Sequence, residues 1–152
     1  MMRQRATIIV EIDKRILLVE NRGGLLLLPG GGINAAESRL QAAVRELAEE
    51  SGLIAESMLF LFSHESATNC HHVFWAMAPG VPFAGDDATA LHFFDQDHPA
   101  LSGRMSRASR QIVDRFFGIR GDIATGFSSW APGSMAVKVG TSDIETWPGA
   151  YI

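Results

Sequence analysis

The sequence predicts an α/β fold in which one sheet is covered by helices on both faces. Apolar stretches with strand character precede and follow a single amphipathic segment at residues 34–52, and a second amphipathic segment occupies residues 105–117. Strands on both sides of a central helix, with a late second helix, are typical of a sheet between helical layers. The chain has 152 residues, which is enough to bury a core as one domain.

The first part of the chain is expected to form strands. Residues 6–12 and 16–19 are apolar runs rich in β-branched side chains, and Asp13-Lys14 between them supplies the turn of a hairpin. Residues 25–28 form a third, short apolar run. We interpret the three glycines at 30–32, which follow it, as a turn.

A helix is expected to begin near Asn34 and to end at Gly52. Asn34 is the expected N-cap, and Glu37 three residues later completes a capping-box pattern. Gly52 is suited to the left-handed conformation that ends a helix. The side chains that should face the core recur at helical spacing; they are Leu40, Ala43, Val44 and Leu47.

Three glutamates of this helix, Glu46, Glu49 and Glu50, fall on one face beside the apolar stripe. Like charges at this spacing destabilise a helix by roughly 0.2–0.5 kcal/mol per pair. A bound divalent cation would offset that repulsion, because carboxylate oxygens are preferred ligands of Mg²⁺ and Mn²⁺. The acids therefore predict a metal site at the edge of the core-facing side, where a cleft can form.

Two further strands are expected at 57–63 and 72–77, joined by the polar residues 65–69. Residues 91–94 are expected to form the final strand. A second helix should cover 105–117, with the following side chains inward: Ile112, Phe116 and Phe117.

The sequence suggests a main domain at 1–118 and a C-terminal extension at 119–152. The extension contains several large aromatic residues, which argue against a plain disordered linker; they are Phe127, Trp130, Trp147 and Tyr151. We expect it to pack on the sheet domain or on a second subunit, which would make a homodimer.

Composition excludes several classes of function. The formal net charge of −4 gives no basic surface for duplex nucleic acid. The apolar stretch near the N-terminus is broken by Glu11 and Asp13, so we expect neither a signal peptide nor a membrane span. A single cysteine, Cys70, fits a reducing cytoplasm. The histidines lack Cys/His zinc spacing and are expected to be structural or exposed; they are His64, His71, His72, His92 and His98.

Residues 31–53 carry a specific motif, G-x5-E-x7-R-E-U-x-E-E-x-G-U, in which U is aliphatic. Every fixed position is filled, in order, by Gly31, Glu37, Arg45, Glu46, Leu47, Glu49, Glu50, Gly52 and Leu53. The segment resembles the signature of the Nudix hydrolases. The resemblance implies an α/β/α sandwich with a mixed sheet between helices. It also implies a pyrophosphohydrolase that cleaves the diphosphate linkage of a nucleoside diphosphate joined to another moiety.

The resemblance also implies roles for individual residues. Glu49 and Glu50 would be the main metal ligands, with Glu46 assisting, and the cofactor would be Mg²⁺, with Mn²⁺ as the alternative. Arg45 would orient the acids of the motif. Next to the acidic helix, Gly30 and Gly31 would allow the backbone to approach a phosphate. Arg22 is a further phosphate-binding candidate, although an exposed loop arginine is the simpler interpretation.

The general base stays open. A box glutamate such as Glu46 is one candidate. Asp86 and Asp87 lie in a loop about where such family members carry a downstream acid, and simple turn chemistry also explains them. Glu65 is the remaining candidate.

The substrate is indicated only as a class. Residues 65–69 lack the proline of ADP-ribose-type members and the tyrosine of dinucleoside polyphosphate members, which favours nucleoside triphosphates or another small nucleotide. Phe74 and Trp75 are candidates to stack on a base, and core packing is their commoner role. A Nudix-fold sensor that binds a nucleotide without cutting it is the alternative function. Degenerate sensors usually lose the box acids, and this chain keeps them.

Overall fold

The structure is a computed structural model in which residues 1–85, 88–128 and 136–138 are described, with side chains described for 1–85 and 88–121. Its strands are β1 (Arg3–Ile12), β2 (Arg15–Glu20), β3 (Leu26–Leu27), β4 (Gly30–Gly32), β5 (Ser57–Glu65), β6 (Asn69–Met77), β7 (Ala90–Phe94) and β8 (Ala136–Lys138). Its helices are α1 (Arg39–Ser51), a 3₁₀ helix η1 (Pro99–Arg104) and α2 (Arg107–Ser128).

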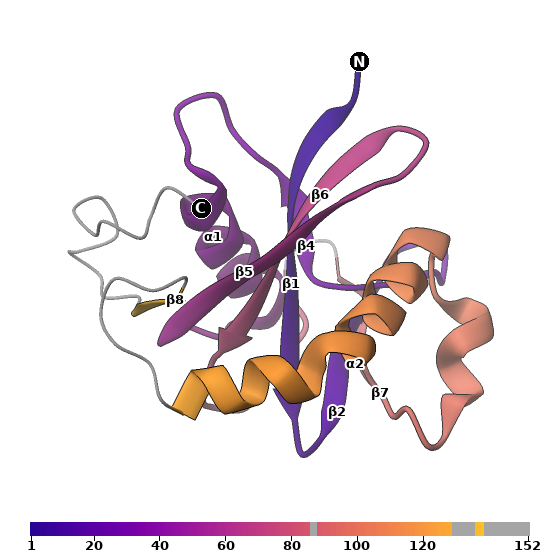
Figure 1. The fold of residues 1–152 in the computed structure, drawn as a ribbon. Coiled ribbons are helices and arrows are strands. Elements are labelled where there is room, and N and C mark those ends of the chain that lie inside the picture. Colours follow the sequence, from indigo (N-terminus) through magenta and orange to yellow (C-terminus); the bar gives the residue numbers. More distant parts are fainter. Residues whose placement is uncertain (86–87, 129–135, 139–152) are drawn as a thin grey trace.

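The strands form one mixed sheet with β1 and β6 at its centre (Figure 1). β1 and β6 run parallel, with Arg5 opposite His71 and Thr7 opposite Val73. The remaining pairs are antiparallel: β4 pairs with the first half of β1, and β2 with its end. β2 then pairs with β3 and β7, while β5 pairs with β6 and β8.

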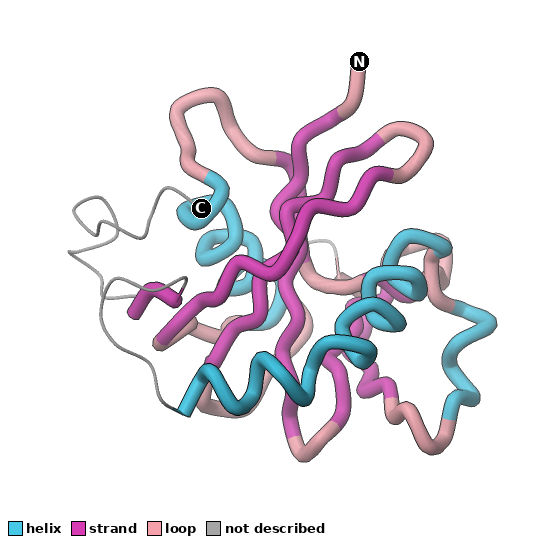
Figure 2. The backbone as a smooth tube through the Cα atoms, viewed as in Figure 1, coloured by secondary structure: helices cyan, strands magenta, loops and turns pink. Residues whose placement is uncertain are grey.

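The two long helices cover opposite faces of this sheet (Figures 1 and 2). Alternate residues of β1 point to opposite faces. Ile8 packs with Leu47 of α1 in one core cluster, whereas Ile9 packs with Phe116 of α2 in the other. The predicted α/β/α sandwich with a mixed sheet between helices is therefore confirmed.

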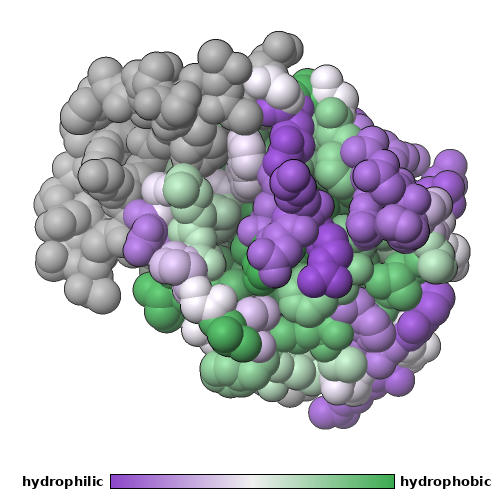
Figure 3. Space-filling model, turned by 90° about the horizontal axis from the view of Figure 1, so that it is seen from below, coloured by the Kyte–Doolittle hydropathy of each residue, from purple (hydrophilic) through white to green (hydrophobic). Residues whose placement is uncertain are grey.

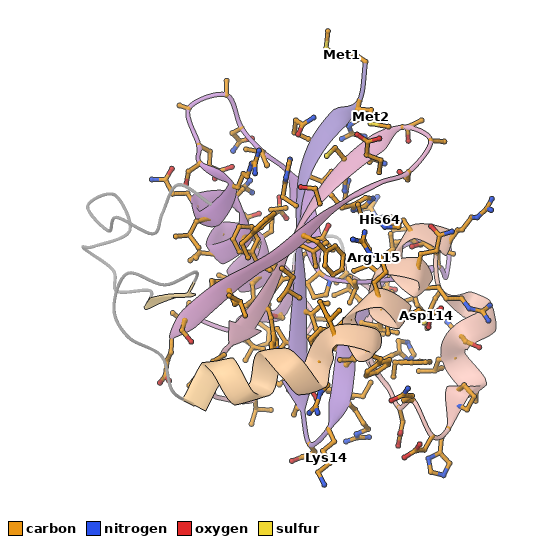
Figure 4. All side chains as sticks on the ribbon, in the orientation of Figure 1. Met1, Met2, Lys14, His64, Asp114 and Arg115 are labelled. Atoms are coloured by element: carbon orange, nitrogen blue, oxygen red, sulfur yellow. The ribbon has the colours of Figure 1, made fainter. Side chains whose placement is uncertain are left out.

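α2 is joined to the sheet by aromatic and polar contacts. Trp75 of β6 meets Phe116 edge to face, with ring centroids 5.1 Å apart. Arg115 lies over the ring of Phe62, 3.8 Å from its centroid, and its Nη1 donates to His64 Nδ1 at 3.0 Å. Figure 4 shows His64 and Arg115 side by side between β5 and α2.

Most of the local predictions hold. Asp13 and Lys14 form the hairpin turn with φ values of 51° and 64°, and Gly52 ends α1 with a φ of 73°. Of the stripe on α1, Leu40, Ala43 and Leu47 are buried and Val44 is partly buried against them. Ile112 and Phe116 are buried on α2, and Phe117 packs beside them.

The predicted start of the first helix was wrong. α1 begins at Arg39, because Ser38 is its N-cap: Ser38 Oγ accepts from Gln41 N at 3.0 Å, and Gln41 Oε1 accepts from Ser38 N at 2.8 Å. Asn34 and Glu37 bond to each other in a separate turn before the helix. The sequence contains two overlapping capping patterns, and the later one begins the helix.

Three other local predictions differ from the structure. Gly30–Gly32 form strand β4 rather than a turn, because their backbone pairs with Arg5–Thr7 of β1. Residues 91–94 are not in the final strand, because β8 follows and pairs with β5. The strands β5 and β6 also extend into the polar stretch 65–69 that was expected to join them.

The predicted division at residue 118 stays a prediction. α2 continues through that position to Ser128. Residues 129–135 and 139–152 lie outside the described part of the chain, and with them Trp130, Trp147 and Tyr151. The expected packing of the extension on the domain or on a second subunit is likewise a prediction.

Figure 3 shows one face of the molecule, on which hydrophilic residues gather in a band beside apolar ones. Exposed large apolar residues include Ile54, Met77, Val81 and Phe83. Among the described helices, none is both long and apolar enough to cross a membrane.

Candidate active site

α1, which carries the acids, is held at both ends. The capping box at Ser38 fixes its beginning, and Gly52 N donates back to Ala48 O at 2.9 Å. Beyond Gly52, a returning loop satisfies carbonyls of the last turn: Phe83 N donates to Ser51 O at 2.9 Å and Gly85 N to Glu50 O at 3.0 Å. A helix that cannot fray at its last turn keeps Glu49 and Glu50 in fixed positions.

Arg45 connects most of the charged groups of the motif. Its Nε donates to Glu37 Oε2 at 2.6 Å and its Nη2 to Glu37 Oε1 at 2.8 Å, a two-pronged pair. Nη1 donates to Glu46 Oε1 at 2.8 Å and to Glu49 Oε2 at 3.1 Å. Nη2 also donates to Gly32 O at 3.0 Å. One guanidinium thus joins the segment before the helix, two helix acids and β4.

This network shifts protonation equilibria in the expected directions. The hydrogen bonds from Arg45 lower the pKa of the Glu37 carboxyl, against an opposing effect of burial. The same bonds to Glu37, and then those to Glu46, raise the pKa of Arg45. Glu37 and Arg45 are therefore both charged near neutral pH and act as a structural pair.

The glycines of β4 lie directly against the helix acids. Glu50 Oε2 accepts from Gly30 N at 3.2 Å. A Cβ at Gly31 would collide with the carboxylate of Glu46, so any larger residue there would displace that carboxylate. The Glu46 side chain is 13% exposed and that of Glu49 is 43% exposed. This agrees with the predicted order, in which Glu46 and Glu50 lie beside the apolar stripe and Glu49 lies further out.

A cavity of about 220 Å³ opens beside Glu50. Its lining combines aliphatic, acidic and basic side chains from several strands: Arg5, Val19, Glu20, Asn21, Leu27, Leu28, Gly30, Glu50 and Ala88. A larger cavity, of about 350 Å³, lies among α2, η1 and Phe94, and shares no lining residue with the first. We place the candidate site in the smaller cavity, because it contains Glu50 and Gly30.

The sequence did not indicate Arg5, Thr7 and His71 as residues at or near the site. Arg5 lines the cavity, and its Nη2 is 3.5 Å from Gly30 O. Thr7 Oγ1 and His71 Nδ1 share a hydrogen bond of 2.9 Å between two buried side chains. Burial, and then the charge of Arg5, lower the pKa of His71 to about 4. The alternation of Arg5 and Thr7 with apolar neighbours was the available signal that they share one face.

The sequence analysis also missed Glu20 as a wall of the cavity. Its carboxylate contacts Arg104 and accepts from Thr89 Oγ1 at 3.2 Å. Thr89 N donates in turn to Glu20 O at 2.9 Å. This network fixes the chain that returns beside Ala88 to the end of β2.

The acids suit a divalent cation by their chemistry, since all their donor atoms are carboxylate oxygens. Within the described part of the chain, no three acidic, histidine or cysteine side chains converge closely enough to hold a metal. The reason lies in their contacts, because Arg45 holds Glu46 and Glu49 while Glu50 turns to Gly30 N. A metal ion bound by these three acids would compete with those bonds.

The remaining predicted residues fall outside this arrangement. Arg22 is exposed in the turn after β2 and does not line the cavity, and neither does the exposed Glu65 at the end of β5. Asp86 and Asp87 lie outside the described residues. Phe74 is 1% exposed and Trp75 packs on Phe116, so both belong to the core rather than to a base-stacking surface.

A family model described as the NUDIX domain matches residues 2–116. An ADP-ribose pyrophosphatase from Methanocaldococcus jannaschii is 36% identical over 98 residues, which are 57% of this chain and 58% of the relative. The match thus spans less than two thirds of that protein.

Solved structures show the same fold. A putative Nudix hydrolase family member from Chromobacterium violaceum is 29% identical, with a TM-score of 0.76 over 84% of this chain and 89% of that one. A MutT NUDIX hydrolase from Burkholderia pseudomallei is 26% identical, with a TM-score of 0.64 over 75% of this chain and 97% of the other.

Proposed function

Because the chain belongs to the Nudix family, we propose that it is a metal-dependent hydrolase that cleaves the diphosphate linkage of a small nucleotide. The observation that carries this proposal is the grouping of Glu46, Glu49 and Glu50 on one face of α1, with Glu50 lining a cavity. Acids kept together against their repulsion are typical of a cation site.

Glu49 and Glu50 would hold the metal ion, with Glu46 assisting, and Mg²⁺ or Mn²⁺ suits these oxygen ligands. The ion would supply charge neutralisation at the phosphate oxygens and would activate a water. Arg45 acts on this site indirectly, since it positions Glu46 and Glu49 through its hydrogen bonds. Gly30 and Gly31, which carry no side chain, would allow the backbone of β4 to approach a phosphate.

In the proposed reaction, water attacks one phosphorus atom of the P–O–P linkage and the bridging oxygen leaves with the other phosphate. A carboxylate accepts the proton of the attacking water. Glu46, Asp86, Asp87 and Glu65 are the candidates for this base. The pH dependence of kcat in their single amide variants separates them, because only loss of the base should abolish the acidic limb.

The substrate class is a nucleoside diphosphate joined to another group. Among the described residues, the aliphatic and polar lining of the cavity includes no aromatic side chain on which a base could stack. The name of the Methanocaldococcus relative makes ADP-ribose a compound to test, beside the nucleoside triphosphates that the sequence favours. We propose the class and leave the choice within it to a substrate panel.

The test is release of nucleoside monophosphate from a panel of nucleoside triphosphates, ADP-ribose and dinucleotides, with Mg²⁺, Mn²⁺ or EDTA. We expect activity with either ion and none with EDTA. Glu50→Gln, and to a lesser degree Glu49→Gln, should lower kcat by roughly a hundredfold or more while the fold persists.

Glu56→Gln is the matched control, since Glu56 is an exposed glutamate just beyond the motif. It should retain wild-type kinetics. Full activity in EDTA, or in both Glu49→Gln and Glu50→Gln, would contradict the metal assignment. A protein that binds nucleotides with Mg²⁺ but releases no product would be the non-catalytic sensor.

A further inference from the structure

Arg5 stands out among the arginines of this protein. It reaches from β1 into the wall of the candidate cavity and is half-buried. Arg45, Arg104 and Arg120 each form an ion pair with a glutamate, whereas Arg5 has no such pair in the described part of the chain. Among the described residues, the guanidinium of Arg5 makes a hydrogen-bond contact with Gly30 O alone, and its length of 3.5 Å is the outer limit of such a bond.

A partly buried positive charge is destabilising unless an anion lies close enough to compensate it. Taking a cation out of water without a partner is unfavourable. Burial, and next the charge of Arg3, lower the pKa of Arg5, while the carboxylates of Glu50 and Glu46 raise it. A guanidinium nevertheless stays protonated near neutral pH.

His71, the neighbour of Arg5 on β6, does not neutralise the charge of Arg5. His71 lies opposite Arg5 in the pairing of β1 with β6, and it is only 8% exposed. Its Nδ1 is engaged by Thr7 Oγ1, and the imidazole remains uncharged near neutral pH. The positive charge of Arg5 is therefore directed toward the cavity, beside Gly30 N and Glu50.

We propose that Arg5 binds a phosphate group of the substrate and fixes the end of the cavity at which the diphosphate lies. A planar guanidinium can donate to two phosphate oxygens at once, which suits this position better than a flexible ammonium group. The inference rests on the proposed function, and it assigns to β1 a binding residue that lies outside the Nudix motif.

The test uses inorganic pyrophosphate as the probe and the full chain as the protein, with affinity measured by calorimetry in Mg²⁺ and again in EDTA. Arg5→Gln should weaken pyrophosphate binding roughly tenfold or more in both conditions, as loss of a charge-assisted hydrogen bond would. Arg5→Lys, which keeps the charge but not the fork, should lie between wild type and Arg5→Gln.

Arg3→Gln is the matched control. Arg3 precedes Arg5 by two residues on the same face of β1 and is exposed, so its removal changes the net charge equally. Because solvent and salt screen an exposed charge, the affinity of Arg3→Gln should stay within about twofold of wild type. Arg22→Gln, tested in parallel, should behave like Arg3→Gln.

The outcomes are distinct. Equal weakening by Arg3→Gln and Arg5→Gln would reduce the effect to net charge and overturn the assignment. Unchanged affinity in Arg5→Gln, or no pyrophosphate binding by the wild type in either condition, would also overturn it. Should Arg5→Gln not unfold cooperatively, Arg5→Lys decides: weaker pyrophosphate binding than in the wild type supports the assignment, and wild-type affinity overturns it. Selective loss in Arg5→Gln without nucleotide hydrolysis by the wild type would refute the proposed function alone.

Discussion

The two helices cover the same sheet by different means. On the α2 face, Phe116 is fully buried and meets Trp75 and Phe117. On the α1 face, the apolar stripe is bordered by Glu46, which packs against Gly31 and Arg45. The α2 side thus depends on aromatic packing, while the edge of the α1 side depends on a charge network.

This difference between the two faces indicates that the α1 side contains the less stable arrangement. Three glutamates on one helix face repel one another, and the ion pairs to Arg45 offset only part of that repulsion. Among the described residues, no cluster of three acids borders the contacts of Phe116. We therefore expect substitutions on the α2 face to lower stability and substitutions of the α1 acids to lower activity with little effect on stability.

The largest effect is expected from Phe116→Ala. This change removes a fully buried ring from the α2 core and should lower the free energy of unfolding by about 3–5 kcal/mol. Denaturant titration would measure it. Glu49→Gln on the other face should leave the metal-free stability unchanged or raised, because it relieves repulsion. Similar losses in both variants would contradict the comparison.

Arg45→Met should have the next largest effect. It leaves the carboxylates of Glu37 and Glu46, each 13% exposed, without their ion pair, and should lower stability by roughly 3 kcal/mol. Added Mg²⁺ should raise the melting temperature of Arg45→Met more than that of the wild type, because the ion can bind the released carboxylates. Equal shifts in both proteins would show that Arg45 and the metal do not compete.

Acidification should weaken the fold through His71. Its pKa is about 4 in the folded protein, below the ordinary value of 6.5, so the unfolded chain binds the proton more readily. Stability should therefore fall by about 2 kcal/mol as the pH drops from 6.5 to 4.5. His72, whose pKa burial also lowers, acts in the same direction.

Thermal unfolding across this pH range measures the effect of His71. A His71→Gln variant should show a shallower decline than the wild type. His98→Gln is the control, because the His98 side chain is 82% exposed, and this variant should keep the wild-type slope. An unchanged slope in His71→Gln would show that His71 is not the group responsible.

The smallest effect concerns the start of α1. Ser38→Ala should destabilise the protein by about 1 kcal/mol, since it removes the hydroxyl that accepts from Gln41 N. Asn34→Ala should have less effect, because Asn34 contributes only backbone atoms to the bonds with Glu37. A larger destabilisation by Asn34→Ala than by Ser38→Ala would indicate that Asn34 is the N-cap, as the sequence predicted.

Local features of the site were predictable from the sequence, since short-range chemistry determines them. The spacing of Glu46 and Glu50 beside the apolar stripe needs only helical periodicity, and the end of α1 needs only Gly52. The start of α1 was misplaced because Asn34 with Glu37 and Ser38 with Gln41 both satisfy a capping pattern. Local sequence does not determine which of these two capping patterns begins the helix in the folded protein.

Contacts between distant strands were not predictable in the same way. Arg5 reaches the cavity only because β1 pairs with β4 and β6, and the sequence does not reveal that register. The glycines at 30–32 look like a turn until β1 is beside them. The sequence around Phe74 and Trp75 has the same strand pattern whether their rings face a ligand or a helix. The contact of Trp75 with Phe116 shows that Trp75 faces α2.

The parallel pairing of β1 with β6 also bears on the order in which the molecule assembles. The bond between Thr7 and His71 joins residues 64 apart in sequence, so a long loop must close before that contact stabilises anything. The turns of α1 and the hairpin of β1 and β2 need far shorter closures, and local contacts form faster. We expect α1, with its three glutamates, to form before β1 pairs with β6 and brings Arg5 beside them. Pulse-labelling hydrogen exchange during refolding would record this as protection of α1 ahead of β6.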